Sequence, residues 1–135
     1  MTDFKAIYKN ILTLAPELWS LRVGSALKSK VDGLMDLNLD VLQKEGNAMV
    51  IALSHYYKHE SGDMIADPDM EIRLTKNGFA EALSYQDSYV YQRVYFDSNS
   101  LSPKLKESLN SFLEQWLRNC INQGHQLNKY KREKD

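Results

Sequence analysis

Two histidines, a series of acids and a pair of tyrosines lie close together in residues 53–86, LSHYYKHESGDMIADPDMEIRLTKNGFAEALSYQ. Imidazole and carboxylate groups can move protons near neutral pH, and both can ligate metals. This segment therefore holds the side chains best suited to chemistry. None of its spacings matches a metal, phosphate or nucleophile signature, so the residue types do not name a reaction.

A metal site in this segment would use His59, Asp63, Asp67 and Asp69. On a helix, His55 and His59 would lie on the same face, at the HxxxH spacing that is typical of zinc sites. In a strand, where alternate residues share a face, this spacing no longer indicates a zinc site. The run DMIADPD has neither the length nor the ligand order of an EF-hand loop. The alternative is that Asp-Pro-Asp forms a turn whose carboxylates accept backbone N–H bonds. Both interpretations stay open.

An enzyme that uses the segment from His55 to Glu71 is a second interpretation, in which a small ligand or a metal takes part. Its acid-base pair would be His55 or His59 with Glu71 or Glu81, because a histidine beside a carboxylate titrates in the physiological range. The sequence contains no GxSxG motif and no glycine-rich phosphate loop. The alternative makes His55 a partly buried, hydrogen-bonded strand residue and pairs Glu81 with Arg73 across two strands.

The tyrosines favour a binding function. Tyrosine combines a large contact area with a polar tip, which suits protein interfaces. A sheet that is covered on one side leaves a free face for a partner, although period two also sends alternate tyrosines into the core. The candidate binding residues are Tyr56, Tyr57, Tyr85, Tyr89, Tyr91 and Arg93.

The charge balance disfavours nucleic acid as the partner. The chain has 17 Lys and Arg against 18 Asp and Glu, a net charge of -1, whereas phosphate-backbone binding needs a basic surface. Stacking of single strands on the aromatic run YVYQRVYF is disfavoured because only Arg93 in it is basic. No cofactor and no membrane partner are indicated.

Length and cysteine content indicate one cytoplasmic domain. We expect a single domain over residues 1–127 and a disordered charged tail over residues 128–135. Cys120 is the only cysteine, so no internal disulfide can form, and we expect it to be a small core residue in a reducing compartment. The N-terminus lacks the features of a signal peptide, and no apolar run is long enough to span a membrane.

Helices are predicted at both ends. Apolar residues of residues 4–12 recur at helical spacing behind Thr2 or Asp3 as N-cap, and Pro16 ends that helix before a further turn at residues 17–19. The C-terminal helix begins with Ser102 as N-cap and Pro103 at its first position, and Gly124 follows its end. Its apolar stripe consists of Leu105, Leu109, Phe112, Leu113, Trp116, Leu117 and Cys120.

Strands are predicted between the helices, after a mobile surface linker at residues 24–33. Residues 37–41 and 49–53 alternate around the Gly46-Asn47 turn, and residues 70–74 and 79–85 flank the Asn77-Gly78 turn. Residues 89–96 are aromatic and β-branched, which indicates one more strand. The prediction is an α+β fold whose antiparallel sheet of four to five strands, in hairpin or meander order, is covered on one face by the N- and C-terminal helices.

Three runs carry a resemblance to a known family: ALSHYYKHESGDMIADPDMEIRL, FAEALSYQ and LNSFLEQWLRNCINQG. They resemble an uncharacterised bacterial family, a domain of unknown function often encoded on plasmids, prophages and integrative elements. The likeness covers roughly residues 37–124, and the C-terminal helix is also similar to the small YqiB-like proteins. The resemblance implies a mobile-element setting and a fold, but no activity, cofactor or catalytic residue.

Mobile elements carry small proteins that disable host defences, CRISPR inhibitors among them. By this analogy we expect a non-enzymatic interaction protein that binds a host or element-encoded protein, with an anti-defence role such as anti-CRISPR activity as one form of it.

Overall fold

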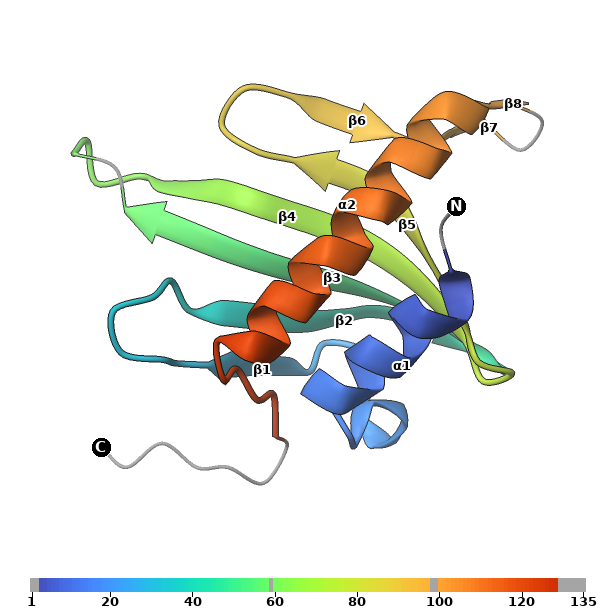
Figure 1. Cartoon of the computed structure of the whole chain (residues 1–135), viewed down its shortest axis with the longest axis horizontal. Coiled ribbons are helices and arrows are strands. Elements are labelled where there is room, and N and C mark those ends of the chain that lie inside the picture. The colour runs from blue at the N-terminus through green and yellow to red at the C-terminus, as the bar shows by residue number, and fades with distance from the viewer. Residues whose placement is uncertain (1–2, 59, 98–99, 129–135) are drawn as a thin grey trace.

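The structure is a computed structural model, and it describes residues 3–58, 60–97 and 100–128. An antiparallel sheet forms one layer, and the two long helices lie side by side across one of its faces (Figure 1). We call the other face of the sheet the open face. The predicted disordered tail, residues 128–135, lies outside the described residues except for Asn128.

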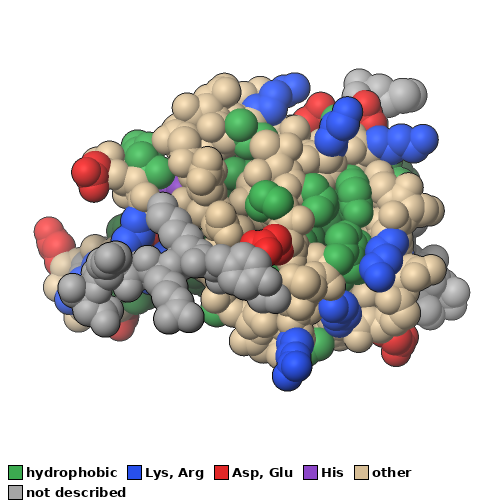
Figure 2. All heavy atoms as spheres, turned by 90° about the horizontal axis from the view of Figure 1, so that it is seen from below, with side chains coloured by type: hydrophobic (Ala, Val, Ile, Leu, Met, Phe, Trp, Pro, Cys, Tyr) green, Lys and Arg blue, Asp and Glu red, His purple; other side chains and the backbone are tan. Residues whose placement is uncertain are grey.

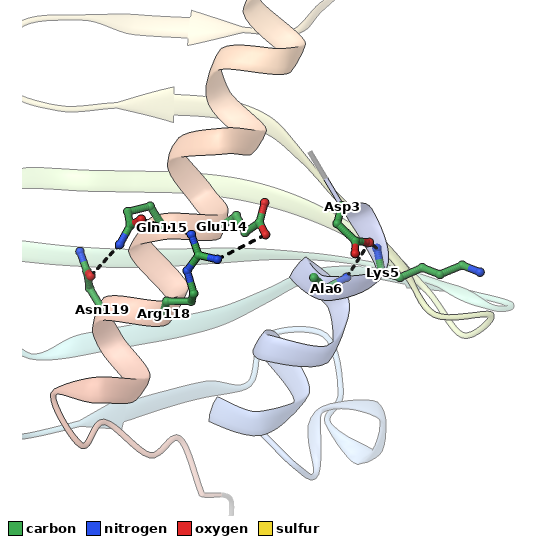
Figure 3. Close-up of polar contacts among 7 residues, drawn as sticks. All are labelled: Asp3, Lys5, Ala6, Glu114, Gln115, Arg118 and Asn119. Carbon is green, nitrogen blue, oxygen red and sulfur yellow. Dashed lines mark hydrogen bonds and ion pairs between the residues drawn. The ribbon is translucent and has the colours of Figure 1, made fainter. Parts of the chain in front are cut away.

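The N-terminal helix α1 spans Phe4–Leu14. The Asp3 side chain accepts hydrogen bonds from the backbone N–H groups of Lys5 and Ala6 at 3.0 and 3.1 Å, and so caps the helix as predicted (Figure 3). Its buried residues are spaced i, i+4, i+7, which places them on one face, against the sheet. They are Ile7, Ile11 and Leu14. A single 3-10 turn, η1 at Leu18–Ser20, follows the proline as the sequence predicts.

The C-terminal helix α2 spans Pro103–Asn122. The Ser102 hydroxyl accepts from the Leu105 N–H at 3.2 Å, and Gly124 ends the helix with a φ of 91°, a conformation that favours glycine. Most of the predicted stripe is buried, but Phe112 is 40% exposed, because it lies at the margin of the stripe. On its outer side, Arg118 pairs with Glu114 and also donates to Gln115 (Figure 3).

Six strands of the described residues form the main sheet, in the sequential order of a meander. Tight turns at Gly46 and Gly78, both with positive φ, join the second strand to the third and the fourth to the fifth. A pair of short strands forms a separate ribbon before α2. The strands are β1 Ala26–Ser29, β2 Leu37–Glu45, β3 Ala48–Lys58, β4 Met64–Thr75, β5 Phe79–Gln86, β6 Tyr91–Arg93, β7 Tyr95–Asp97 and β8 Ser100–Leu101.

The core fills the space between the sheet and the helices. Leu39, Ile51 and Ile72 are fully buried at its centre on three successive strands, and Leu113 and Leu117 meet them from α2. Burying each such side chain contributes about 1.5–3 kcal/mol relative to exposing it. Because these side chains pack together, α2 lies with its predicted apolar stripe against the sheet, and Trp116 is buried on that side.

The free edge of β5 is sealed by a side chain from α2. Asn110 is fully buried, and its Oδ1 accepts the Ala82 N–H at 2.8 Å while its Nδ2 donates to the Lys106 carbonyl at 2.8 Å. The Ala82 N–H would otherwise have no strand to donate to, since β6 pairs only with residues 84–86 of β5. Asn110 therefore replaces a missing strand at this point.

Three features of the predicted sheet are wrong. The sheet has six strands in the described residues and not four to five, because β1 lies within residues 24–33, which the sequence analysis assigned to a mobile linker. The run DMIADPD, which the sequence analysis interprets as a metal-binding loop or an Asp-Pro-Asp turn, is largely strand, since β4 begins at Met64 and pairs with β3 from there. The predicted strand at residues 89–96 is divided between β6 and β7, which belong to different sheets.

Candidate functional site

The open face carries two rows of side chains that run across all six strands. Paired residues of an antiparallel sheet point to the same side, so the register alone assembles each row. Polar residues fill most positions, with one tyrosine and one arginine at the β6 end. One row is Lys28, Asn38, Ser54, Asp69, Gln86 and Tyr91, and the other is Ala26, Asp40, Ala52, Glu71, Ser84 and Arg93.

A hollow of about 540 Å³ opens on this face over the first three strands. We call it the β1–β3 hollow. It combines an apolar side, which includes the exposed Met64, with a floor of polar groups from β2 and β3. Its lining residues are Ala26, Leu27, Lys28, Asn38, Asp40, Ser54, Tyr56 and Met64.

Negative charge gathers at the hollow. Burial raises the pKa of Asp40, and the nearby charge of Asp69 raises it further. The Tyr56 hydroxyl donates a hydrogen bond to Asp69 Oδ2. Burial, this bond and the charges of the two carboxylates raise the pKa of Tyr56 to about 12. Among the described residues, no lysine or arginine forms an ion pair with either carboxylate.

The tip between β5 and β6 holds an exposed tyrosine on an ordered turn. The Asp87 Oδ1 accepts from the backbone N–H groups of Tyr89 and Val90 at 2.8 and 3.0 Å, and its Oδ2 accepts from the Tyr85 hydroxyl at 2.7 Å. These bonds lower the pKa of Asp87, the Tyr89 N–H bond most. The turn leaves the Tyr89 side chain 92% exposed, with Val90 and Tyr91 exposed beside it.

A cluster of imidazole and thiol groups lies on the helix side of the sheet. His55 Nδ1 is 2.9 Å from the Asp36 carbonyl, which only accepts, so Nδ1 carries the proton and Nε2 is free to accept from Cys120 Sγ at 3.9 Å. Burial raises the pKa of the Cys120 thiol to about 12, so it is no nucleophile near neutral pH. These contacts confirm Cys120 as a core residue and His55 as a buried, hydrogen-bonded strand residue.

His125 lies beside this cluster, after the end of α2. Its Nδ1 is 2.9 Å from the Ser29 hydroxyl, and its buried Nε2 has no hydrogen-bond partner among the described residues. Burial lowers the pKa of His125, and the neighbouring His55 lowers it further, against an opposing effect of Asp36. A cavity of about 300 Å³ near this cluster is lined in part by His55, Asp67 and Trp116.

The predicted tyrosines do not form one patch. Tyr56, Tyr91 and Arg93 lie on the open face, and Tyr89 lies at the β5–β6 tip. Tyr85 instead packs on the helix side, edge-on to the Phe112 ring at 5.4 Å. A bulge explains this difference, because β5 carries an extra residue opposite the step from Glu71 to Ile72. Tyr57, 37% exposed, points away from the open face.

The predicted metal ligands are separated by a second bulge. β4 has one residue more than β3 opposite His55, so Asp67 turns to the helix side and lines the cavity there, whereas Asp69 stays on the open face with Tyr56. Asp63 is exposed in the turn before β4, and His59 lies outside the described residues. Among the described residues, no three His, Cys, Asp or Glu side chains are placed to hold a metal ion.

The predicted acid-base residues do not meet either. His55 faces the helices and Glu71 the open face, so the sheet lies between them. Glu81 is opposite Arg73 in the register, yet it accepts a hydrogen bond from the Tyr95 hydroxyl and pairs with Lys106 of α2 at 3.7 Å. The predicted Arg73–Glu81 pair is therefore replaced by a contact with the helix.

Sequence reasoning missed the floor of the β1–β3 hollow. Asn38 and Asp40 alternate with buried leucines in β2, and this alternation already indicates that they point away from the core. It also missed Asp87, although an aspartate two and three residues before the N–H groups that it accepts is the pattern of an Asx turn.

The side of the molecule on which β1 lies presents a further surface. Figure 2 shows hydrophobic side chains gathered in one area there, with Lys and Arg side chains around it. Val23 and Leu42 are both exposed, and a hydrogen bond from the Gly24 N–H to the Val41 carbonyl at 2.8 Å joins their neighbouring residues.

These features define an α+β domain with an antiparallel meander that is open on one face. Residues 6–126 match DUF6908, a domain of unknown function, and the chain belongs to that family. The match confirms an uncharacterised domain family and extends beyond the predicted residues 37–124. No curated protein and no solved structure matches the chain. In the described part of the chain, no helix has both the length and the apolar character needed to cross a membrane.

Proposed function

We propose that this chain is a non-enzymatic protein-binding domain that holds its partner with the β5–β6 tip and the adjoining open face of the sheet. The observation that carries the proposal is the position of Tyr89, 92% exposed on a turn that three hydrogen bonds to Asp87 hold in place. An ordered turn loses little conformational entropy on binding, so an aromatic side chain presented on it gains affinity when it enters a pocket.

The open face next to the tip extends this surface. Tyr91 and Arg93 of β6 belong to the two rows of side chains that cross the sheet, and both are exposed. Tyrosine and arginine are the residue types that dominate the energy of protein interfaces. Inhibition of a host defence protein, encoded on a bacterial mobile element, is one form that such binding would take, and it follows only from the family resemblance.

Site-specific photo-crosslinking tests the proposal. A photoreactive phenylalanine analogue at position 89 should capture a discrete partner in the producing cell, and position 91 should capture the same one. The same analogue at Lys9, which is exposed on α1, is the control and should capture none of it.

Binding of the purified partner then gives the magnitude. Tyr89→Ser should weaken the complex about 30-fold, as loss of a hot spot of about 2 kcal/mol does. Tyr57→Ser removes a second exposed tyrosine that points away from the open face, and it should leave the affinity unchanged. Equal loss in both variants, or loss in the Tyr57 variant alone, would place the interface elsewhere.

A further inference from the structure

The floor of the β1–β3 hollow presents hydrogen-bond acceptors that nothing in the described part of the chain satisfies. Ser54 is only 2% exposed, lies on the open face in the lining of the hollow, and its hydroxyl has no partner among the described residues. Asn38 Nδ2 donates to the Ser54 carbonyl at 3.5 Å, which leaves Asn38 Oδ1 as an acceptor. The Ser54 oxygen is therefore open to the hollow, and together with Asn38 Oδ1 it suits this floor to a ligand that donates hydrogen bonds.

Charge selects the kind of donor. The carboxylates of Asp40 and Asp69 lie close enough to raise the pKa of Asp40, and Tyr56 occupies only one oxygen of Asp69. Two uncompensated carboxylates repel an anion and favour a cation. A metal ion is disfavoured, because the described residues supply no set of three His, Cys, Asp or Glu ligands here.

We propose that the β1–β3 hollow binds a primary ammonium group carried on a short apolar stem. An ammonium has three donors and no acceptor. They match the Asp40 carboxylate, the Ser54 hydroxyl and Asn38 Oδ1, while the apolar side chains of Ala26 and Met64 in the lining of the hollow cover the stem. The same chemistry occurs in a lysine side chain of another protein and in a free alkylamine.

Lys28 is the one cation in the lining. Its side chain is exposed and forms no ion pair with Asp40 or Asp69 among the described residues. It competes with the ligand through its charge. A variant that lacks this charge should therefore bind the ammonium group more tightly than the parent.

NMR titration of the whole chain tests the proposal. n-Butylammonium, added at pH 7 and constant ionic strength, should shift the amide signals of Asn38 and Ser54 saturably, and 1-butanol should not. Nα-acetyl-lysine methylamide is the second probe: tighter binding than n-butylammonium indicates a lysine side chain as the natural ligand, and weaker binding indicates a free amine. Either order of affinity between the two probes supports an ammonium site.

Four variants, each first checked for folding by circular dichroism, fix the location. Asp40→Asn should weaken n-butylammonium binding roughly tenfold, since it removes a charge-assisted bond, and Ser54→Ala severalfold. Asp63→Asn makes the same change of charge at an exposed turn and should alter binding by less than about twofold. Lys28→Gln should tighten it. Equal shifts with 1-butanol, equal loss in the Asp40 and Asp63 variants, or no saturable shift would overturn the proposal.

Discussion

Replacement of Asn110 by leucine should destabilise the protein although the two side chains have similar size. In the parent, the buried Asn110 Oδ1 accepts the Ala82 N–H at the edge of β5. Leucine fills the same space but leaves this N–H without an acceptor, and an unsatisfied buried donor costs about 1–3 kcal/mol. The Lys106 carbonyl, which Asn110 Nδ2 also contacts, keeps its helical partner, so it adds little.

Urea unfolding measures this effect. With an m-value of about 2 kcal/mol/M, the midpoint of the Asn110→Leu variant should fall by roughly 0.5–1.5 M. Hydrogen exchange of the Ala82 amide should accelerate more than that of the amides inside the β3–β4 pairing, because the lost bond is local. Asn122→Leu, an exposed substitution of the same kind in the same helix, should leave the midpoint within experimental error. An unchanged midpoint for Asn110→Leu would refute the assignment of Asn110 as the edge seal.

The other predictions concern the helix side of the sheet. Trp116→Ala should cost about 3–5 kcal/mol because the buried ring lies between α2 and the sheet; a circular dichroism melt that matches the parent would contradict the helix-on-sheet packing. His125 has its pKa lowered below 6.5 in the folded chain, so the unfolded state binds a proton more readily and stability should fall as the pH drops from about 6.5 towards the folded pKa. His125→Gln should flatten this part of a plot of melting temperature against pH. Cys120, whose thiol pKa burial raises to about 12, should react with iodoacetamide in urea and not in buffer, as mass spectrometry would show.

The sequence predicts those elements that local signals define. The α2 helix has a serine cap, a proline at its first position and a long apolar stripe, and the two tight hairpins have glycine turns, so each element carries its own boundary signals. The strand β1 has no such signal. It is short and forms only because β2 offers it an edge.

Bulges explain why the candidate site was less predictable than the fold. Alternation of period two assigns faces correctly only until an extra residue enters a strand. The bulge in β4 separates Asp67 from Asp69, and the bulge in β5 turns Tyr85 towards α2. The pairing partner decides where such a residue enters, and a single strand's sequence does not show it. Asn38 and Asp40 lie before the bulge of β2, so the alternation of the sequence alone assigns their side chains correctly to the open face.

The packing of α1 has a consequence for the order in which the chain folds during synthesis. Each strand of the main sheet pairs with the next one made, so the meander can form by successive local pairings, a topology that folds quickly. Helix α1 is different, because it packs on β5 and on α2, and α2 is made after all the strands of the main sheet. The part of the apolar face of α1 that packs on α2 therefore stays exposed to water until residues 103–122 have left the ribosome. A nascent chain stalled before α2 should thus keep this face accessible to chaperones and prone to aggregation.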